Sequence, residues 1–202
     1  MTESGAGAAD TTAVVLAGGT SRRFGSDKLA APLRGSTVLD EALDGLPADW
    51  PVVVVGAERA TRRTVVWTRE DPPGGGPLAA VAAGLALVGT HLVAVLAGDM
   101  PDGGPAVAGL AAALRGAPPE VGAVVATDAH GVANPLLAAY RVAEVRRMLP
   151  DPARDRPAKT LFDVPHTLLL VEGTGASDVD TPADLAGLSS SSEPPDARTA
   201  TT

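Results

Sequence analysis

The stretch AVVLAGGTSRRFGSDK, residues 13–28, joins a short aliphatic run to a loop rich in glycine and positive charge. The aliphatic run predicts a buried strand over 12–16. Two adjacent glycines leave the backbone after it open, so that successive N–H groups can point at one anion while Arg23 and Lys28 approach its oxygens. The spacing fits neither a dinucleotide-binding glycine loop nor a P-loop. The stretch predicts a polyphosphate-binding loop of another kind, the alternative being an ordinary turn with exposed basic residues.

Beyond this loop, short aliphatic runs alternate with helical patterns. Strands are predicted over 12–16, 51–55, 64–67, 91–97, 122–127 and 167–171. Helices are predicted near 37–46, 78–88, 105–115, 141–149 and 182–187. This alternation predicts βαβ units, and uniformly apolar runs such as PVVVV suit strands covered on both faces. We therefore expect an α/β fold, a three-layer Rossmann-like sandwich with a mostly parallel central sheet that binds ligands at the carboxyl ends of its strands.

The length and composition predict one domain with two tails. Residues 1–11 and 187–202 are small and polar, the second rich in Ser and Pro, and are predicted to be disordered. The single domain then occupies 12–186. The N-terminal stretch lacks the basic start and apolar run of a signal peptide, which predicts a cytoplasmic protein. An uncharged run over 72–98 could span a bilayer by length, but its Gly and Pro breaks predict a loop, a helix and a strand instead, so no membrane contact is expected.

The charge and residue usage exclude several classes of function. A net charge of −8 and an aromatic content of 2% argue against a nucleic-acid partner, because the chain would repel phosphates and has few rings on which bases could stack. The absence of Cys excludes thiolate-bound metals. Any metal is therefore expected to be a hard cation held by oxygen.

Three further stretches place polar residues at the ends of predicted elements. EDPPGGGPLAAVAAGL (70–85) puts a glycine turn before a helix, which suits close approach of a base or ribose, or makes a flexible loop. HLVAVLAGDMP (91–101) ends an uncharged strand in Asp99, either a placed charge or a turn former. In ASDVDTPADL (176–185) the TPADL part reads as a helix start, with Asp180 just before it.

Together these stretches resemble one enzyme family. LAGGTSRRFGSDK closely resembles the signature Leu-Ala-Gly-Gly-x-Ser-x-Arg-Met-Gly-x-Asp-Lys of the molybdenum cofactor guanylyltransferases, which are GT-A-like nucleotidyltransferases, with Phe24 in place of the usual Met. The other three stretches follow in the order of the family, and the resemblance spans about 12–186. It implies that Arg23, Lys28 and Asp99 are catalytic. It implies a nucleotide site made of Leu16, Ala17, Gly18, Gly19, Lys28, Asp71, Gly76, Pro77, Leu78 and Asp99.

The resemblance also implies a cofactor and an acceptor side. Mg²⁺ would be held by Asp99 and Asp180, with Asp178 the weaker candidate. Asn134 stands before Pro135 where some relatives carry His-Pro, so it either contacts the pterin acceptor or shapes a loop. A group of basic residues could bind the acceptor phosphate or lie on a solvated helix face: Arg141, Arg146, Arg147, Arg154, Arg156 and Lys159.

The function implied is transfer of GMP from GTP to the phosphate of molybdenum-molybdopterin, with release of pyrophosphate. The repulsion between two anions is the main obstacle, so positioning and charge neutralisation are expected to carry the reaction. Transient contacts with molybdoenzymes or other cofactor-biosynthesis proteins are expected. Two alternatives remain, namely a sibling nucleotidyltransferase that uses CTP or another phosphorylated acceptor, and a catalytically idle nucleotide-binding module.

Overall fold

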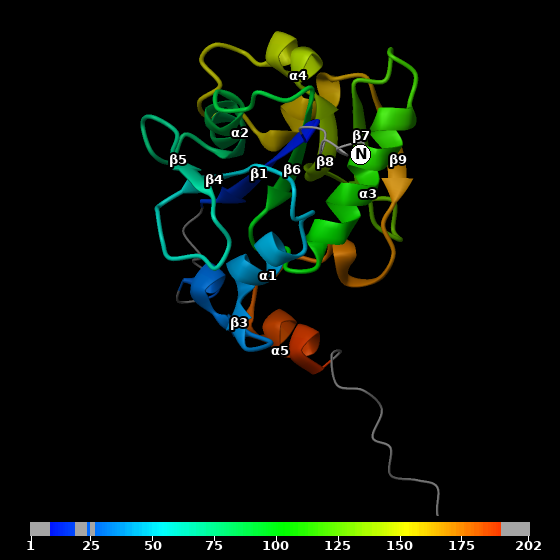
Figure 1. The fold of residues 1–202 in the computed structure, drawn as a ribbon. Coiled ribbons are helices and arrows are strands. Elements are labelled where there is room, and N and C mark those ends of the chain that lie inside the picture. Colours follow the sequence, from blue (N-terminus) through cyan, green and yellow to red (C-terminus); the bar gives the residue numbers. More distant parts are fainter. Residues whose placement is uncertain (1–8, 19–23, 25–26, 191–202) are drawn as a thin grey trace, which may run out of the picture.

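A seven-stranded sheet forms the centre of the computed structural model, which describes residues 9–18, 24 and 27–190 (Figure 1). The strand order is β5-β4-β1-β6-β8-β7-β9. Its strands are β1 (Thr11–Ala17), β4 (Val52–Gly56), β5 (Val66–Thr68), β6 (Leu92–Ala97), β7 (Ala123–Thr127), β8 (Ala133–Arg141) and β9 (His166–Leu170). All neighbours pair in parallel except β8, which runs antiparallel to both β6 and β7. The predicted α/β fold with a mostly parallel sheet is confirmed.

Helices cover both faces of the sheet, as Figure 1 shows. The α-helices are α1 (Val38–Asp44), α2 (Pro77–Leu85), α3 (Gly103–Gly116), α4 (Val142–Met148) and α5 (Pro182–Ser190). Three short 3₁₀ turns are η1 (Lys28–Ala30), η2 (Ala158–Asp163) and η3 (Gly173–Ala176), and a small hairpin consists of β2 (Pro32–Leu33) and β3 (Ser36–Thr37). The uncharged run over 72–98 forms a loop, α2 and β6, as expected. Within the described ranges, the structure contains no helix with the length and hydrophobicity to cross a membrane.

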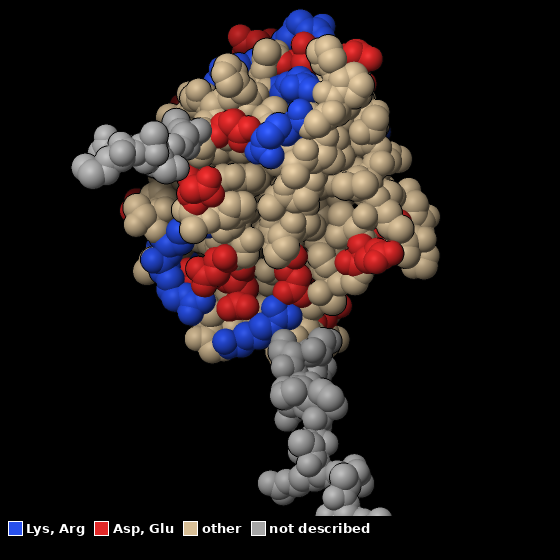
Figure 2. Space-filling model, turned by 45° about the vertical axis from the view of Figure 1, so that its right-hand side comes forward, with Lys and Arg blue, Asp and Glu red and all other residues tan. Residues whose placement is uncertain are grey.

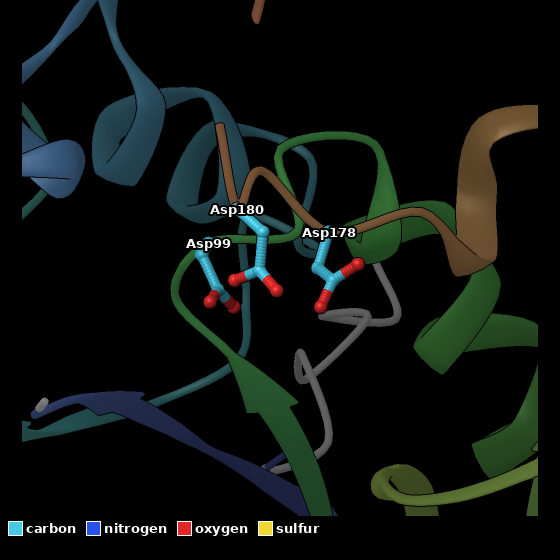
Figure 3. A group of neighbouring side chains, drawn as sticks. All are labelled: Asp99, Asp178 and Asp180. Carbon is cyan, nitrogen blue, oxygen red and sulfur yellow. The ribbon is translucent and has the colours of Figure 1, made fainter. Parts of the chain in front are cut away.

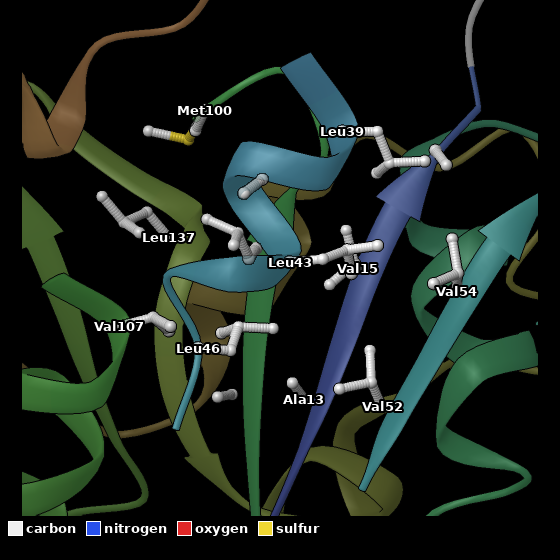
Figure 4. Close-up of a cluster of buried hydrophobic side chains, with 14 of the residues drawn as sticks. Ala13, Val15, Leu39, Leu43, Leu46, Val52, Val54, Met100, Val107 and Leu137 are labelled. Atoms are coloured by element: carbon white, nitrogen blue, oxygen red, sulfur yellow. The ribbon is translucent and has the colours of Figure 1, made fainter. Parts of the chain in front are cut away.

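Two aliphatic cores lie between these layers, because successive side chains of a strand point to opposite faces. On β1, Ala13 and Val15 face the core under α1 and α3, whereas Val14 faces the core under α2 and α4. Figure 4 shows the first core, where Leu39 and Leu43 of α1 pack over the strands. Buried Val, Leu and Ala supply nearly all of both cores, in keeping with the scarcity of aromatic residues.

Two glycines allow neighbouring elements to lie in close contact. A β-carbon on Gly84 would lie 2.5 Å from Cγ1 of Val14, so α2 can rest directly on β1 only without one. A β-carbon on Gly104 would lie 2.3 Å from the carbonyl carbon of Gly45, where the start of α3 passes the end of α1. The second contact fixes the distance between the two helices of one face.

Strand β8 was not predicted. Its sequence begins with Asn134 and Pro135, which read as a loop because proline cannot donate to a strand ladder. The structure accommodates the proline at an irregularity, since Val125 pairs with Ala138 whereas the next residue, Ala126, pairs with Asn134. The strand is therefore real, and its proline lies in the bulge rather than in the regular ladder.

The folded part of the chain extends beyond the predicted range of 12–186 at both ends. Thr11 is buried and pairs with Leu92 of β6, so the folded part begins before residue 12. Helix α5 extends to Ser190, and Leu188 is buried in the core under α1 and α3. Arg34 explains this extension in part, because its Nη2 donates to the Leu188 carbonyl oxygen at 3.3 Å. Figure 1 shows α5 beside β3 at the lower end of the molecule.

Candidate active site

Three carboxylates converge at the carboxyl end of the central strands (Figure 3). Asp99 follows β6, and Asp178 and Asp180 lie in the segment between η3 and α5. One carboxylate oxygen from each residue lies within 4.8 Å of the others. The edge of the sheet predicted to bind ligands therefore carries a dense negative charge.

Backbone hydrogen bonds hold these two segments together. The Val179 N–H donates to the Asp99 carbonyl oxygen at 2.8 Å, and the Val179 side chain is fully buried. On the far side, Oδ2 of Asp184 accepts from the Asp180 N–H at 3.0 Å and from the Thr181 N–H at 2.7 Å. This is a capping box at the start of α5. The position of the Asp180 carboxylate is thus set by β6 on one side and by the helix start on the other.

Lys28 lies between two of the carboxylates. Its Nζ is 2.5 Å from Oδ2 of Asp99 and 3.1 Å from Oδ1 of Asp180. Burial lowers the pKa of the Lys28 ammonium, but the hydrogen bonds and charges of Asp99 and Asp180 outweigh burial and raise the pKa above its ordinary value. For Asp178, desolvation and then the charge of Asp99 raise the pKa of its carboxyl. Lys28 therefore stays charged and offsets part of the negative charge.

Asp27 and Arg59 position Lys28, and sequence reasoning did not single them out. Oδ1 of Asp27 accepts from the Leu29 N–H at 3.2 Å and so caps η1. Oδ2 of Asp27 accepts from Nη1 of Arg59 at 2.5 Å. The Leu29 side chain is buried, which anchors the same turn. Asp27 stands inside the quoted signature, but its partner is more than thirty positions away, so only the fold reveals the contact.

The three carboxylates of Asp99, Asp178 and Asp180 fit a hard divalent cation. The donors are carboxylate oxygens alone, which is the donor type that Mg²⁺ prefers. The Lys28 ammonium already lies between two of them, so a positive charge is stable at this position. Asp99, Asp180 and Asp178 are the described residues that could hold such an ion.

The carboxyl end of β1 lies at the same edge. The Gly98 N–H donates to the Leu16 carbonyl oxygen at 2.9 Å, which ties the end of β1 to the residue before Asp99. Ala17 is buried, whereas a β-carbon on Gly18 would meet nothing within 4 Å. Gly18 is therefore exposed at the end of the strand, and none of the described residues lies against it. Gly19 and Arg23 lie outside the described residues.

The predicted nucleoside turn lies before α2. Gly76 caps this helix with φ of 90°, a conformation that favours glycine, and Pro77 occupies the first turn. Leu78 is fully buried and packs into the core under α2 and α4, so it anchors the turn, whereas Asp71 is exposed. The turn packs against a later segment, because the Asp155 N–H donates to the Gly75 carbonyl oxygen at 2.8 Å.

The basic residues predicted near the acceptor fall into two groups. Arg141 donates to the carbonyl oxygens that end α3 and follow it, and Arg146 donates to those of Leu85 and Val88 after α2. Both are structural, because they satisfy carbonyl groups at helix ends. Arg154 and Arg156 lie beside the Gly75–Gly76 turn instead. These four residues therefore do not form one acceptor patch.

Asn134 has a structural role and borders a cavity. Its Oδ1 accepts from the Leu136 N–H at 2.9 Å, and its Nδ2 lies 3.8 Å from the Met100 sulfur. It lines a cavity of about 200 Å³ that shares Asp128 and Ala176 with a cavity of about 810 Å³. The larger cavity extends to Asp178. The two cavities are therefore neighbours, and the larger one reaches one of the three carboxylates.

Comparison with known proteins identifies relatives of this chain. The family model described as the MobA-like NTP transferase domain matches residues 13–167. A Deinococcus radiodurans protein named "Probable molybdenum cofactor guanylyltransferase" is 32% identical over 192 residues, which cover 90% of this chain and 95% of that protein. An Opitutus terrae protein of the same name is 41% identical over 103 residues, or 48% of this chain. That match spans about half of the Opitutus terrae protein, 51% of its length.

A solved structure has a similar fold. It is the molybdopterin-guanine dinucleotide biosynthesis protein A from Archaeoglobus fulgidus, with a TM-score of 0.69, 22% identity, and coverage of 89% of this chain and 97% of that one. At this identity the likeness concerns the fold. The family match over most of the chain and the Deinococcus radiodurans relative decide the assignment: the chain belongs to the MobA-like NTP transferase domain family.

Proposed function

We propose that this protein transfers GMP from GTP to the phosphate of molybdenum-molybdopterin and releases pyrophosphate. The observation that carries the proposal is the position of Lys28 between Asp99 and Asp180, where the first loop, β6 and the start of α5 meet. The family and the names of the relatives agree with nucleotidyl transfer and with this acceptor.

In the proposed reaction, a phosphate oxygen of the acceptor attacks the α-phosphorus of GTP. A new phosphorus–oxygen bond forms while the bond to the oxygen that bridges toward the β-phosphate breaks, and that oxygen leaves with pyrophosphate. The acceptor phosphate is already ionised at neutral pH, so the reaction needs no general base. Bound Mg²⁺ would neutralise charge on the phosphate oxygens.

The residues of the chain have separate roles in this scheme. Asp99 and Asp180 would hold the metal, with Asp178 beside them. Lys28, together with Arg23 and the backbone N–H groups of the loop after β1, would bind the outer phosphates of the nucleotide. Since Lys28 contacts both metal-binding candidates, it has to move toward the phosphates when the nucleotide and metal bind.

The nucleoside and the acceptor would approach from different sides. The turn around Gly76, with Asp71 and Pro77, would take the nucleoside, and the buried Leu78 would anchor this turn. The two cavities lined by Asn134 and by Asp178 would take the acceptor, because the larger one reaches Asp178 of the carboxylate group. The cytoplasmic location and the transient contacts with molybdoenzymes or other cofactor-biosynthesis proteins remain part of this proposal.

Pyrophosphate release tests the proposal. The purified protein is mixed with Mg²⁺, molybdenum-loaded molybdopterin and each of the four nucleoside triphosphates in turn, and release is expected with GTP. Asp99→Asn should lower turnover by about a hundred- to a thousandfold or more, in line with the loss of a key electrostatic group. Asp44→Asn, a change of the same kind on the exposed face of α1, should leave turnover unchanged.

Two results would contradict this assignment. Near-normal turnover by Asp99→Asn would show that the carboxylate of Asp99 is not needed for the reaction, which contradicts its proposed role. A clear preference for CTP would keep the chemistry but reject GTP as the donor.

A further inference from the structure

Strand β9 forms one edge of the sheet and exposes three leucine side chains. All five of its residues are exposed, and Leu168, Leu169 and Leu170 are exposed to 53%, 42% and 52%. It is the last strand in the sheet order, and no described strand pairs with its outer side. It lies at the right of Figure 1, and Figure 2, which brings that side forward, shows a broad surface with few charges. Three adjacent leucines are thus left partly in water.

The opposite edge of the sheet is built differently. Strand β5 has three residues, and charged residues stand close on both sides of it: Arg62, Arg63, Arg69 and Glu70. Short edge strands and nearby charges are common protections against pairing with another chain. Strand β9 has no Lys, Arg, Asp, Glu or Pro within its five residues. Its sequence therefore permits pairing at the edge.

The hydrogen bonds to β7 show which backbone groups point outward. The Val171 N–H donates to the Thr127 carbonyl oxygen at 2.9 Å, and the Pro165 carbonyl oxygen accepts from Gly122 and Ala123. Odd-numbered residues of this segment therefore bond to β7. The backbone N–H and C=O groups of successive residues point to opposite sides of a strand. Those of the even-numbered residues 166, 168, 170 and 172 therefore point to the open edge.

We propose that β9 pairs with β9 of a second copy of this chain, antiparallel and centred on Leu169. Leu168 would then exchange two hydrogen bonds with Leu170 of the second copy, and these are even-numbered residues, as the direction of their groups requires. His166 would lie opposite Glu172 of the second copy at both ends of the pairing. Glu172 is extended, with φ of −85° and ψ of 160°, so the strand conformation continues to it.

Side-chain complementarity selects this register. Centring on Leu168 would set His166 opposite Leu170, and centring on Leu170 would set Leu168 opposite Glu172. Only the register centred on Leu169 pairs leucine with leucine and imidazole with carboxylate at the same time. Leu170 and Glu172 also line the cavity of about 810 Å³, so the second copy would stand at its rim.

Cysteine cross-linking tests the pairing, because the natural chain has no cysteine. Leu169→Cys would meet its own copy across the two-fold axis at a non-hydrogen-bonded position, where Cα atoms are about 4.5 Å apart and a disulfide can form. Leu168→Cys would lie about 8 Å or more from its copy and should cross-link poorly. Val66→Cys, on the opposite edge strand and 56% exposed, is the matched control.

Sedimentation of the uncross-linked protein gives an independent measurement. The wild type should shift from monomer toward dimer between about 5 and 200 µM, a range suited to a small interface. Leu168→Lys should remain monomeric over that range, whereas Val66→Lys should behave as the wild type. Retained far-UV circular dichroism would show that each variant is folded.

Several results would overturn the proposal. These are a wild type that stays monomeric, cross-linking that is as strong at position 66 as at 169, and cross-linking that is strongest at 168. A monomer whose β9 amides become protected only when an extended segment of another protein is added would also overturn it, since the edge would then serve a different partner.

Discussion

Among single residues, Lys28 has the largest effect on the charge of the carboxylate group. Its ammonium contacts Asp99 and Asp180 while Asp178 lies nearby, so a metal ion and Lys28 compete for the same oxygens. Under the proposed function, a bound triphosphate would supply new partners for the ammonium and new oxygens for the metal. We therefore expect metal binding to be weak without nucleotide and stronger with it.

Substitution of Lys28 tests this competition. Lys28→Met should increase the affinity for Mn²⁺ in the absence of nucleotide by about tenfold, because a competing positive charge is removed. Electron paramagnetic resonance of free Mn²⁺ measures the affinity without any need for turnover. Lys159→Met, which changes the other lysine of the chain at an exposed position, is the control and should have no effect. Unchanged affinity in Lys28→Met would contradict the competition.

The sequence was informative about residues whose position follows from local structure. The order of elements places Asp99 after a strand and Asp180 before a helix start, whereas their meeting with Lys28 in one site was implied only by the resemblance to the enzyme family. The links from Asp27 to Arg59 and from Arg141 to the carbonyl groups near the end of α3 could not, because each joins groups that only tertiary packing brings together. Isolated arginines carry no signal that distinguishes a ligand contact from a helix-end contact.

At the level of elements, two of the four glycines of α3 lie in contrasting surroundings. Gly104 faces Gly45 of the neighbouring helix end, whereas a β-carbon on Gly109 would meet nothing within 4 Å. Gly104→Ala should lower the free energy of unfolding by about 1–3 kcal/mol, because backbone must move. Gly109→Ala should raise it by about 0.5–1 kcal/mol through helix propensity. Urea denaturation measures both, and equal effects would contradict the close contact.

The start of β1 is joined to the last turn of α3 by an ion pair. Nε of Arg115 lies 2.6 Å from Oδ2 of Asp10, and this contact lowers the pKa of Asp10 from 3.8 to about 2. Because the folded state holds the lower pKa, the pair stabilises the fold above about pH 4, and this contribution is lost as the pH falls toward 2.

Asp10→Asn measures this contribution. The variant should lose about 0.5 kcal/mol of unfolding free energy at pH 7, a typical value for an exposed pair. The difference between wild type and variant should shrink when urea denaturation is repeated near pH 2.5. A difference that is the same at both pH values would show that the charge of Asp10 is not its cause.

The start of α5 connects helix capping with the carboxylate group. Asp184→Ala removes the acceptor of the Asp180 and Thr181 N–H groups, so Asp180 should be held less firmly. We expect weaker Mn²⁺ binding in the presence of nucleotide and a small decrease in melting temperature. Ser189→Ala, which removes a hydroxyl contact at the other end of the same helix, should leave metal binding unchanged.

For the whole molecule, burial predicts the order of hydrogen exchange. Amides of the central strands β1 and β6 should exchange slowest, because both strands are buried and paired on both sides. In β9, residues 168 and 170 should exchange faster than 169 and 171 at low protein concentration. Amide-resolved exchange checks both statements, and uniform protection along β9 in the monomer would contradict the second.

The hydrogen bond from Val179 to Asp99 has a consequence for synthesis of the protein. Asp180 follows Lys28 by 152 residues, and all strands of the sheet precede it in the chain. A product that ended before this last segment would carry every strand of the sheet but lack one of the carboxylates and the bond that orients it. If Asp180 holds the metal as proposed, such a shortened product could form its sheet but would not complete the metal site.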